Sequence, residues 1–191
     1  MIESPQPAQG GMPFDPHQFM KEGNAPFVHP DMVISTDLPP AMTNLPLSWI
    51  APKGWTEQKG SGLRLATFIS EGTDDKIECS IVSLGGMAGG VKANIVRWLG
   101  QVKIPIPSDE ELEQFLARQE DFESKGHWKG KLLDLTQLQK DEPSSTAGMM
   151  AAMIETGEAQ IFVKMTGTKA ALEKNKTAFR ELCASLELKN G

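Results

Sequence analysis

Short apolar runs separated by turn residues dominate the chain from Leu47 onward. Runs rich in Ile, Val, Leu and Phe that are bounded by Gly, Pro or Asp are typical of strands. They predict strands from residue 47 to between 52 and 54, and over residues 63–70, 76–84, 130–139, 148–156 and 159–167. The Met and Ala residues of 148–156 are equally compatible with a helix. The runs at 63–70 and 76–84 form a predicted hairpin around the turn EGTDD. Both alternating faces of this pair are apolar, so we expect it to be covered on both sides.

Three other segments have helical periodicity. In residues 90–102, apolar residues recur at spacings of four, three and four: Val91, Ile95, Trp98 and Val102. Residues 108–126 open with Ser108 and Glu111 in capping-box spacing, which is typical of a helix start. The apolar residues expected on one side of this helix are Leu112, Phe115, Leu116 and Phe122. A last helix is expected from about Thr168, on an apolar stripe that ends at Leu186.

The order of these elements indicates the fold class. Consecutive strand pairs, with helices grouped between and after them, predict an α+β fold with a largely antiparallel sheet. Residues 1–46 contain nine of the 13 prolines and show no sustained period. Proline lacks the backbone donor that helices and sheets need. We therefore expect a proline-rich, mostly irregular tail or linker over residues 1–46 and a single α+β domain over 47–191.

Charge and composition exclude several classes of protein. The net charge is −6 and the pI is near 5.1, and no basic cluster is present, so we expect no nucleic-acid partner. The uncharged stretch at residues 79–91 is interrupted by glycines and is shorter than the ~20 apolar residues of a spanning helix. The N-terminus has no signal-peptide pattern. The sequence as written fits the cytoplasm, or an exported location if a signal was removed.

Four glycines lie close together where a strand is expected to give way to a helix: Gly85, Gly86, Gly89 and Gly90. Such a junction can bind an anion through backbone N–H groups at the helix start. A phosphate-binding loop, however, requires Lys directly after Gly90, where Val91 stands, and the dinucleotide motif requires Gly at position 87. The glycines therefore serve either a tight turn or a generic anion site.

A polar stripe follows the glycines on the expected helix 90–102. Asn94, Arg97 and Gln101 recur at spacings of three and four, and only Arg97 is charged. Amide and guanidinium groups have fixed donor geometry and are suited to recognition. Trp98 lies beside the stripe and offers an apolar surface with one donor. These four residues, with the four glycines, form the predicted binding surface.

Residues suited to catalysis or metal binding are scarce. His127 is the one histidine outside the proline-rich segment, and no G-x-S-x-G elbow is present to position a serine. No His or Cys spacing is typical of a metal site, so we expect no cofactor and no metal. Cys79 and Cys183 fall on apolar faces and are expected to be buried, reduced and inert. The sequence favours a protein that is not an enzyme.

The order of motifs resembles a bacterial family of unknown function that is common in planctomycetes. The likeness rests on Trp49, Pro52, Gly54 and Trp55, the glycine turn, Asn94, Arg97, Trp98 and Gln101, and the segment FVKMTG before a helix with Phe179, Ser185 and Leu186. The P-x-G-W motif and the strand–turn–helix finish are also similar to the Mog/PsbP-like fold. That resemblance implies an antiparallel sheet with helices on both faces.

Known members of that fold include PsbP subunits, Mog proteins, DcrB-type lipoproteins and secretion chaperones. The resemblance therefore implies an accessory or binding role, often in an exported or lipid-anchored protein. This sequence departs from that pattern because it has no signal or lipobox. We expect a non-enzymatic binding module with an unidentified protein or small-ligand partner. The alternative is a small enzyme or sensor that binds an anionic metabolite at residues 85–90.

Overall fold

The computed structural model describes residues 45–70, 76–86, 89–139 and 141–189. The chain divides into two units, Met1–Thr36 and Asp37–Gly191, and every described residue belongs to the second. The predicted tail over residues 1–46 lies outside the described residues, except for Leu45 and Pro46. Leu45 already contacts the hydrophobic core. The carbonyl of Pro46 accepts a hydrogen bond from the N–H of Lys189 at 2.7 Å.

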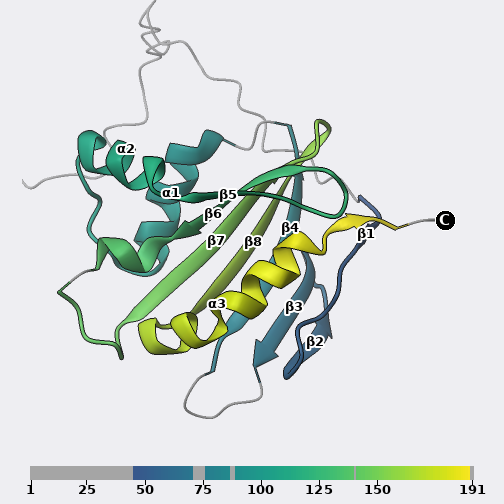
Figure 1. Ribbon diagram of the computed structural model, residues 1–191, viewed down its shortest axis with the longest axis horizontal. Helices are drawn as coiled ribbons and strands as arrows, with labels where there is room; N and C mark the ends of the chain where they lie inside the picture. Colours follow the sequence, from purple (N-terminus) through teal and green to yellow (C-terminus); the bar gives the residue numbers. More distant parts are fainter. Residues whose placement is uncertain (1–44, 71–75, 87–88, 140, 190–191) are drawn as a thin grey trace, which may run out of the picture. The chain divides into compact units, whose positions relative to one another are not determined.

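Nine strands and three α-helices make up the described part of this unit (Figure 1). In chain order they are β1 (Leu47–Ser48), β2 (Trp55–Lys59), β3 (Arg64–Ser70), β4 (Glu78–Gly85), α1 (Gly90–Gln101), α2 (Asp109–Ala117), β5 (Glu120–Glu123), β6 (Lys129–Asp134), β7 (Ala147–Glu155), β8 (Ala159–Thr168), α3 (Lys169–Ala184) and β9 (Glu187–Leu188). A 3-10 turn, Leu135–Leu138, follows β6.

Seven of the strands form one sheet in the order β2-β3-β4-β8-β7-β6-β5, and every neighbouring pair is antiparallel. The short strands β1 and β9 pair separately, also antiparallel. The expected α+β class with an antiparallel sheet is therefore confirmed. The hairpin of β3 and β4 is also present, with Phe68 opposite Cys79.

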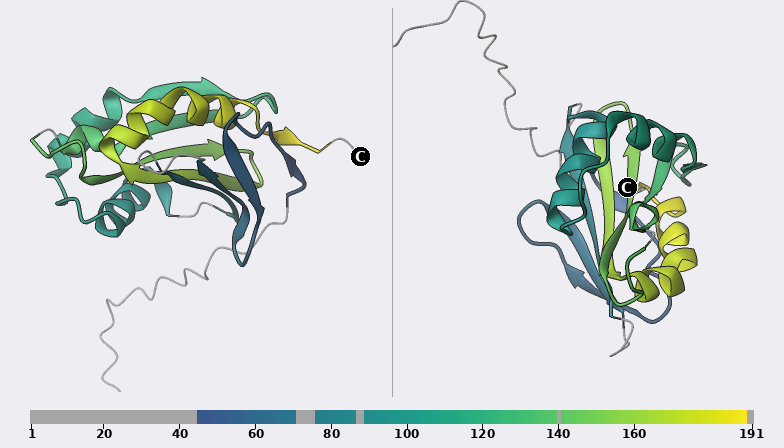
Figure 2. Two further views of the ribbon diagram at one scale, coloured as in Figure 1. Left: turned by 90° about the horizontal axis from the view of Figure 1, so that it is seen from below. Right: turned by 90° about the vertical axis from the view of Figure 1, so that its left-hand side faces the viewer.

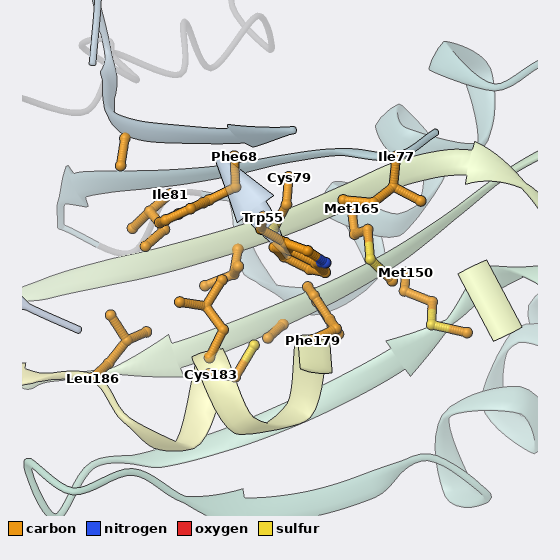
Figure 3. Packing of buried hydrophobic residues seen from close by; sticks show 14 of the residues in the cluster. Trp55, Phe68, Ile77, Cys79, Ile81, Met150, Met165, Phe179, Cys183 and Leu186 are labelled. Atoms are coloured by element: carbon orange, nitrogen blue, oxygen red, sulfur yellow. The ribbon is translucent and has the colours of Figure 1, made fainter. Parts of the chain in front are cut away.

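Helix α3 covers one face of this sheet, which we call the α3 face (Figures 1 and 2). Its apolar stripe packs on alternate residues of the strands, as Figure 3 shows for Phe179 and Cys183 opposite Cys79 and Met165. The buried residues of this core come from β2, β3, β4, β7 and β8 as well as from α3. Burial of this apolar surface is the main force that holds α3 on the sheet.

Helices α1 and α2 cover part of the opposite face, which we call the α1 face (Figure 2). A second core forms there from Ile95, Trp98, Leu99, Ile104, Leu112, Phe115, Leu133, Leu135, Met149, Ala151, Met153 and Phe162. Its sheet residues lie on β6, β7 and β8. Helices therefore cover both faces, as expected. Among the described residues, no helix is long and apolar enough to cross a bilayer.

The first predicted strand, from residue 47 to between 52 and 54, is wrong in its extent. Only Leu47 and Ser48 pair there, and β2 begins at Trp55, after a turn in which Gly54 has a φ of +80°. Strand β2 lies at the edge of the sheet and buries only its first residue. An edge strand with four exposed polar residues has no hydrophobic pattern to reveal it.

The helix predicted over 108–126 is also too long. The capping box of Ser108 and Glu111 is confirmed, but α2 ends at Ala117. Phe122 belongs to the edge strand β5 and contacts the core on the α3 face. A Cβ at Gly130 would collide with its ring, which explains the glycine on the neighbouring strand.

The strand predicted over 130–139 ends earlier, at Asp134. The carboxylate of Asp134 accepts hydrogen bonds from the N–H of Thr136 at 3.2 Å and from its hydroxyl at 2.6 Å. These bonds stabilise the start of the 3-10 turn, because a side-chain acceptor satisfies a donor that would otherwise be unpaired there.

Candidate functional site

The glycine turn is explained by backbone conformation at three of its four glycines. Gly86, Gly89 and Gly90 have φ values of +72°, +86° and +71°, which residues with a Cβ rarely adopt. Gly85 is the last residue of β4 and is buried. Residues 87–88 lie outside the described part of the chain. The turn reading accounts for Gly86, Gly89 and Gly90 without a ligand.

Two residues of the predicted surface lie inside the protein. Trp98 is 2% exposed, and its indole packs edge-on against Phe162 with ring centroids 5.7 Å apart. Asn94 is 1% exposed, and its Nδ2 donates to the carbonyl of Gly90 at 2.7 Å. Both side chains therefore support α1 from within. A partner cannot reach them in this conformation, so the expectation that they offer a contact surface is wrong for these two.

Arg97 and Gln101 are the exposed members of the predicted stripe. The guanidinium of Arg97 donates to Oδ1 of Asn94, which ties it to the buried amide. The Oε1 of Gln101 accepts a hydrogen bond from Nζ of Lys164 at 3.4 Å. This bond joins α1 to β8, so the exposed part of the polar stripe lies next to Lys164 on the sheet.

The sheet beside α1 is polar where the helices do not cover it. The register places Thr67, Ser80 and Lys164 in one row across β3, β4 and β8, with side chains on the α1 face. The next residue of this row, Ala151 on β7, already belongs to the core under α1. Lys164 therefore lies at the boundary between covered and uncovered sheet.

Arg64 reaches the same region because the start of β3 is irregular. The register shifts between Arg64 and Ala66, so Leu65 contacts the core of the α3 face while Arg64 pairs with Val82. A bulge of this kind redirects side chains. The guanidinium of Arg64 lies 2.7 Å from Oε1 of Glu78 and 3.4 Å from the hydroxyl of Thr67.

These residues define a cationic surface, by which we mean Arg64, Arg97 and Lys164 with the neighbouring Gln101. Thr67 and Ser80, in the same row of the sheet as Lys164, are buried. The pKa of Lys164 is lowered, first by burial and then by the nearby Arg64 and Arg97, against the opposing effect of Glu78. The ammonium is thus partly deprived of water beside two like charges. An anion bound there would relieve both costs.

Sequence reasoning found Arg97 and Gln101 of this surface and missed Arg64 and Lys164. One signal for Lys164 was present: it is the single charged residue within the apolar strand β8. Arg64 gave no signal, because its position depends on strand pairing and on the bulge at Leu65.

The groups suited to acid–base or metal chemistry lie outside the cationic surface or far from one another. His127 occupies an exposed turn with a φ of +60°, and its Nδ1 lies 3.0 Å from Oε1 of Glu123. In the parts of the chain that the structure describes, no group of three or more His, Cys, Asp or Glu could hold a metal ion. The cationic surface itself offers charge and hydrogen bonds, which are suited to binding an anion.

Both cysteines are free and buried in the core of the α3 face (Figure 3). Burial raises the pKa of each thiol, and the neighbouring Glu78 adds to the rise for Cys79. A thiol held in its neutral form is a poor nucleophile. The expectation that both are buried and reduced is confirmed.

Comparisons with known proteins give partial likenesses. No protein-family model matches the chain, and no curated protein sequence does. The chain is similar to the solution structure of cyanobacterial PsbP from Synechocystis sp. PCC 6803, with a TM-score of 0.45 and 13% identity over 75% of this chain and 87% of that one. It is also similar to Mycobacterium tuberculosis LpqN, involved in cell envelope biogenesis, with a TM-score of 0.44 and 9% identity over 81% and 88%.

A third similar structure comes from Bacteroides thetaiotaomicron, with a TM-score of 0.41 and 16% identity over 76% of this chain and 46% of that one. Likenesses with scores below 0.5 identify neither a family nor a function. The resemblance to the planctomycete family stays an expectation, and the functional argument rests on this chain's own residues.

Proposed function

We propose that the protein is a non-enzymatic binding module that contacts an acidic protein segment through the cationic surface. The observation that supports this proposal most strongly is the position of Lys164, which is half-buried, donates to Gln101 and lies near two arginines and one carboxylate. Three cations gather there in a chain whose net charge is −6. A local excess of positive charge on an acidic protein attracts anionic partners and orients them.

The chemistry of the surface supports recognition of carboxylates. Arg64 and Arg97 present planar donors that match carboxylate oxygens, while Lys164 supplies a compact charge. Arg64 already holds one carboxylate, Glu78, in an exposed ion pair. Exposed pairs of this kind contribute little, about 0–1 kcal/mol, so a partner's carboxylate can share the guanidinium at small cost.

Binding of a labelled decaglutamate peptide, followed by fluorescence anisotropy at low salt, tests the proposal. A Ser/Gly peptide of the same length is the neutral control. We expect decaglutamate to bind, and its affinity to fall with added salt because the attraction is electrostatic. Lys164→Gln and Arg97→Gln should each weaken it about tenfold. Lys53→Gln, which removes an exposed lysine outside the cationic surface, should leave the affinity unchanged.

Two results would contradict the proposal. One is the absence of decaglutamate binding under these conditions, and the other is equal affinity for the parent, Lys164→Gln and Lys53→Gln proteins. A rise in melting temperature with inorganic phosphate that persists in Lys164→Gln would instead favour the alternative, an anion site at the glycine turn.

A further inference from the structure

A cleft of about 310 Å³ lies on the α3 face, on the opposite side of the sheet from the cationic surface. Helix α3 forms one wall, and the end of α2 with the start of β5 forms the other. Leu132, Met150 and Phe179 line its interior, and the last two are almost fully buried. An apolar interior with a polar rim is typical of small-molecule sites, and this volume is at the lower end of their range.

Two ion pairs join the walls of the cleft. Nζ of Lys176 on α3 lies 3.2 Å from Oδ2 of Asp134 at the end of β6, and Arg180 on α3 pairs with Glu120 on β5. Both cations are at least half exposed, so these pairs contribute little to stability. A ligand's anionic group can therefore share either cation without a large loss in the fold.

Arg118 is the third cation at the cleft. It is exposed, it follows the last residue of α2, and its side chain has no ion pair or hydrogen bond with any residue that the structure describes. The charged side chains that line the cleft are thus three cations and two carboxylates. Lys176 and Arg180 each pair with one of these carboxylates, so the charge of Arg118 is the excess positive charge of the cleft.

We infer that this cleft binds a small carboxylic acid with an apolar body. The apolar part would contact Met150, Phe179 and Leu132, and the carboxylate would pair with Arg118. At ~30 Å³ for each water-sized group, the volume accommodates about ten non-hydrogen atoms. The excess of one positive charge matches a monoanion. This site is independent of the proposed contact with an acidic protein.

Titration with 3-phenylpropionate, followed by NMR of ¹³C-methyl methionine, tests the inference. The methyl resonance of Met150 should shift and saturate with a Kd of a few millimolar or tighter. Met149, the neighbouring residue, belongs to the core on the other face of the sheet. Its resonance should not move, which makes it an internal control. The neutral analogue 3-phenylpropionamide should bind at least tenfold more weakly because it lacks the charge.

Variants locate the two halves of the site. Arg118→Gln should weaken 3-phenylpropionate at least tenfold, because it removes an exposed charge without disturbing the core. Thr177→Trp, at an exposed position of α3 on the cleft, should abolish the Met150 shift by filling the space. Lys53→Gln should change nothing. Equal binding of acid and amide, unchanged affinity in Arg118→Gln, or no shift of Met150 in the parent protein would overturn the inference.

Discussion

The two faces of strands β4 and β8 differ in what covers them. On the α3 face, Cys79, Ile81, Val163 and Met165 are fully buried beneath the helix. On the α1 face, the same strands carry Glu78, which is exposed, Lys164 and Thr166, which are half-buried, and Ser80, which is buried. The two sets of residues alternate along the same two strands. The difference in burial between the faces therefore arises from the side chains and from the position of the helices.

The proposed binding surface lies on the more open of these two faces. Helix α3 packs on a core drawn from β2, β3, β4, β8 and β7, whereas α1 and α2 cover β6, β7 and part of β8 (Figure 2). Beside α1, the sheet carries the half-buried Lys164 and the exposed Arg64, and Arg97 lies on the helix itself. A surface of this composition stays soluble when free and gives an anionic partner specific contacts.

The largest expected effect comes from adjacent residues on opposite faces. Ile81→Ala removes a fully buried side chain from the α3 face and should lower the free energy of unfolding by about 2–5 kcal/mol. Val82→Ala, on the half-buried α1 face, should cost less, about 1 kcal/mol. Urea unfolding monitored by tryptophan fluorescence measures both. Equal losses would mean that the two faces are equally closed.

A pair of glycines on α1 tests the explanation of the glycine turn. Gly90→Ala places a Cβ at a φ of +71° and should destabilise the protein by about 1 kcal/mol, and phosphate should not restore it. Gly100→Ala is the matched control, because a Cβ there meets no atom within 4 Å and the backbone is helical. It should stabilise by about 0.5–1 kcal/mol. If Gly90→Ala were as stable as the parent protein, backbone conformation would not explain the glycine at this position.

Lys164→Met should separate stability from binding. It removes a partly buried cation beside two arginines, so we expect unfolding to become harder by about 0.5–1 kcal/mol at pH 7, while decaglutamate binding weakens. The lowered pKa of Lys164 means that the folded state loses this proton before the unfolded state does. The stability gain should therefore shrink as pH rises through that pKa. A loss of stability at pH 7 would show that the ammonium is well paired.

Arg97→Ala should have the smallest effect on stability, about 0.5 kcal/mol or less, because the side chain is exposed and packs little. The same substitution should nevertheless weaken decaglutamate binding. A loss near 3 kcal/mol in the free energy of unfolding would mean that the guanidinium is buried and stabilises α1 through its hydrogen bond to Asn94. Chemical denaturation of the two proteins side by side measures the difference.

Much of the fold could be predicted where the apolar pattern is strong. Helix α1 matches the predicted 90–102 to within a residue or so, because burial demands a periodic apolar face. Strand β7 matches the predicted 148–156 equally well, although both its faces are buried and its Met and Ala residues were also compatible with a helix. The capping box at Ser108 marked the start of α2. The edge strands β2 and β5 could not be predicted, because their partners hold them by backbone hydrogen bonds and their exposed side chains leave no pattern.

The candidate site was predictable only in part. The spacing of Arg97 and Gln101 identified one side of it, since both lie on a single helix. That spacing could not show that Asn94 turns inward, because the rotation of α1 is set by its packing on Phe162 and the sheet. The burial of Trp98 agrees with its place on the apolar face of the helix. Arg64 joins Arg97 and Gln101 only through the pairing of β3 with β4.

The pKa of Lys164, measured by NMR of its ε-methylene group with and without saturating decaglutamate, tests the proposed binding surface most directly. In the free protein we expect a value below that of an ordinary lysine, because of burial and the nearby arginines. A bound carboxylate stabilises the charged ammonium, so the peptide should raise this pKa. Binding of the peptide with no change in the pKa of Lys164 would contradict the account, since it would place the acidic partner elsewhere.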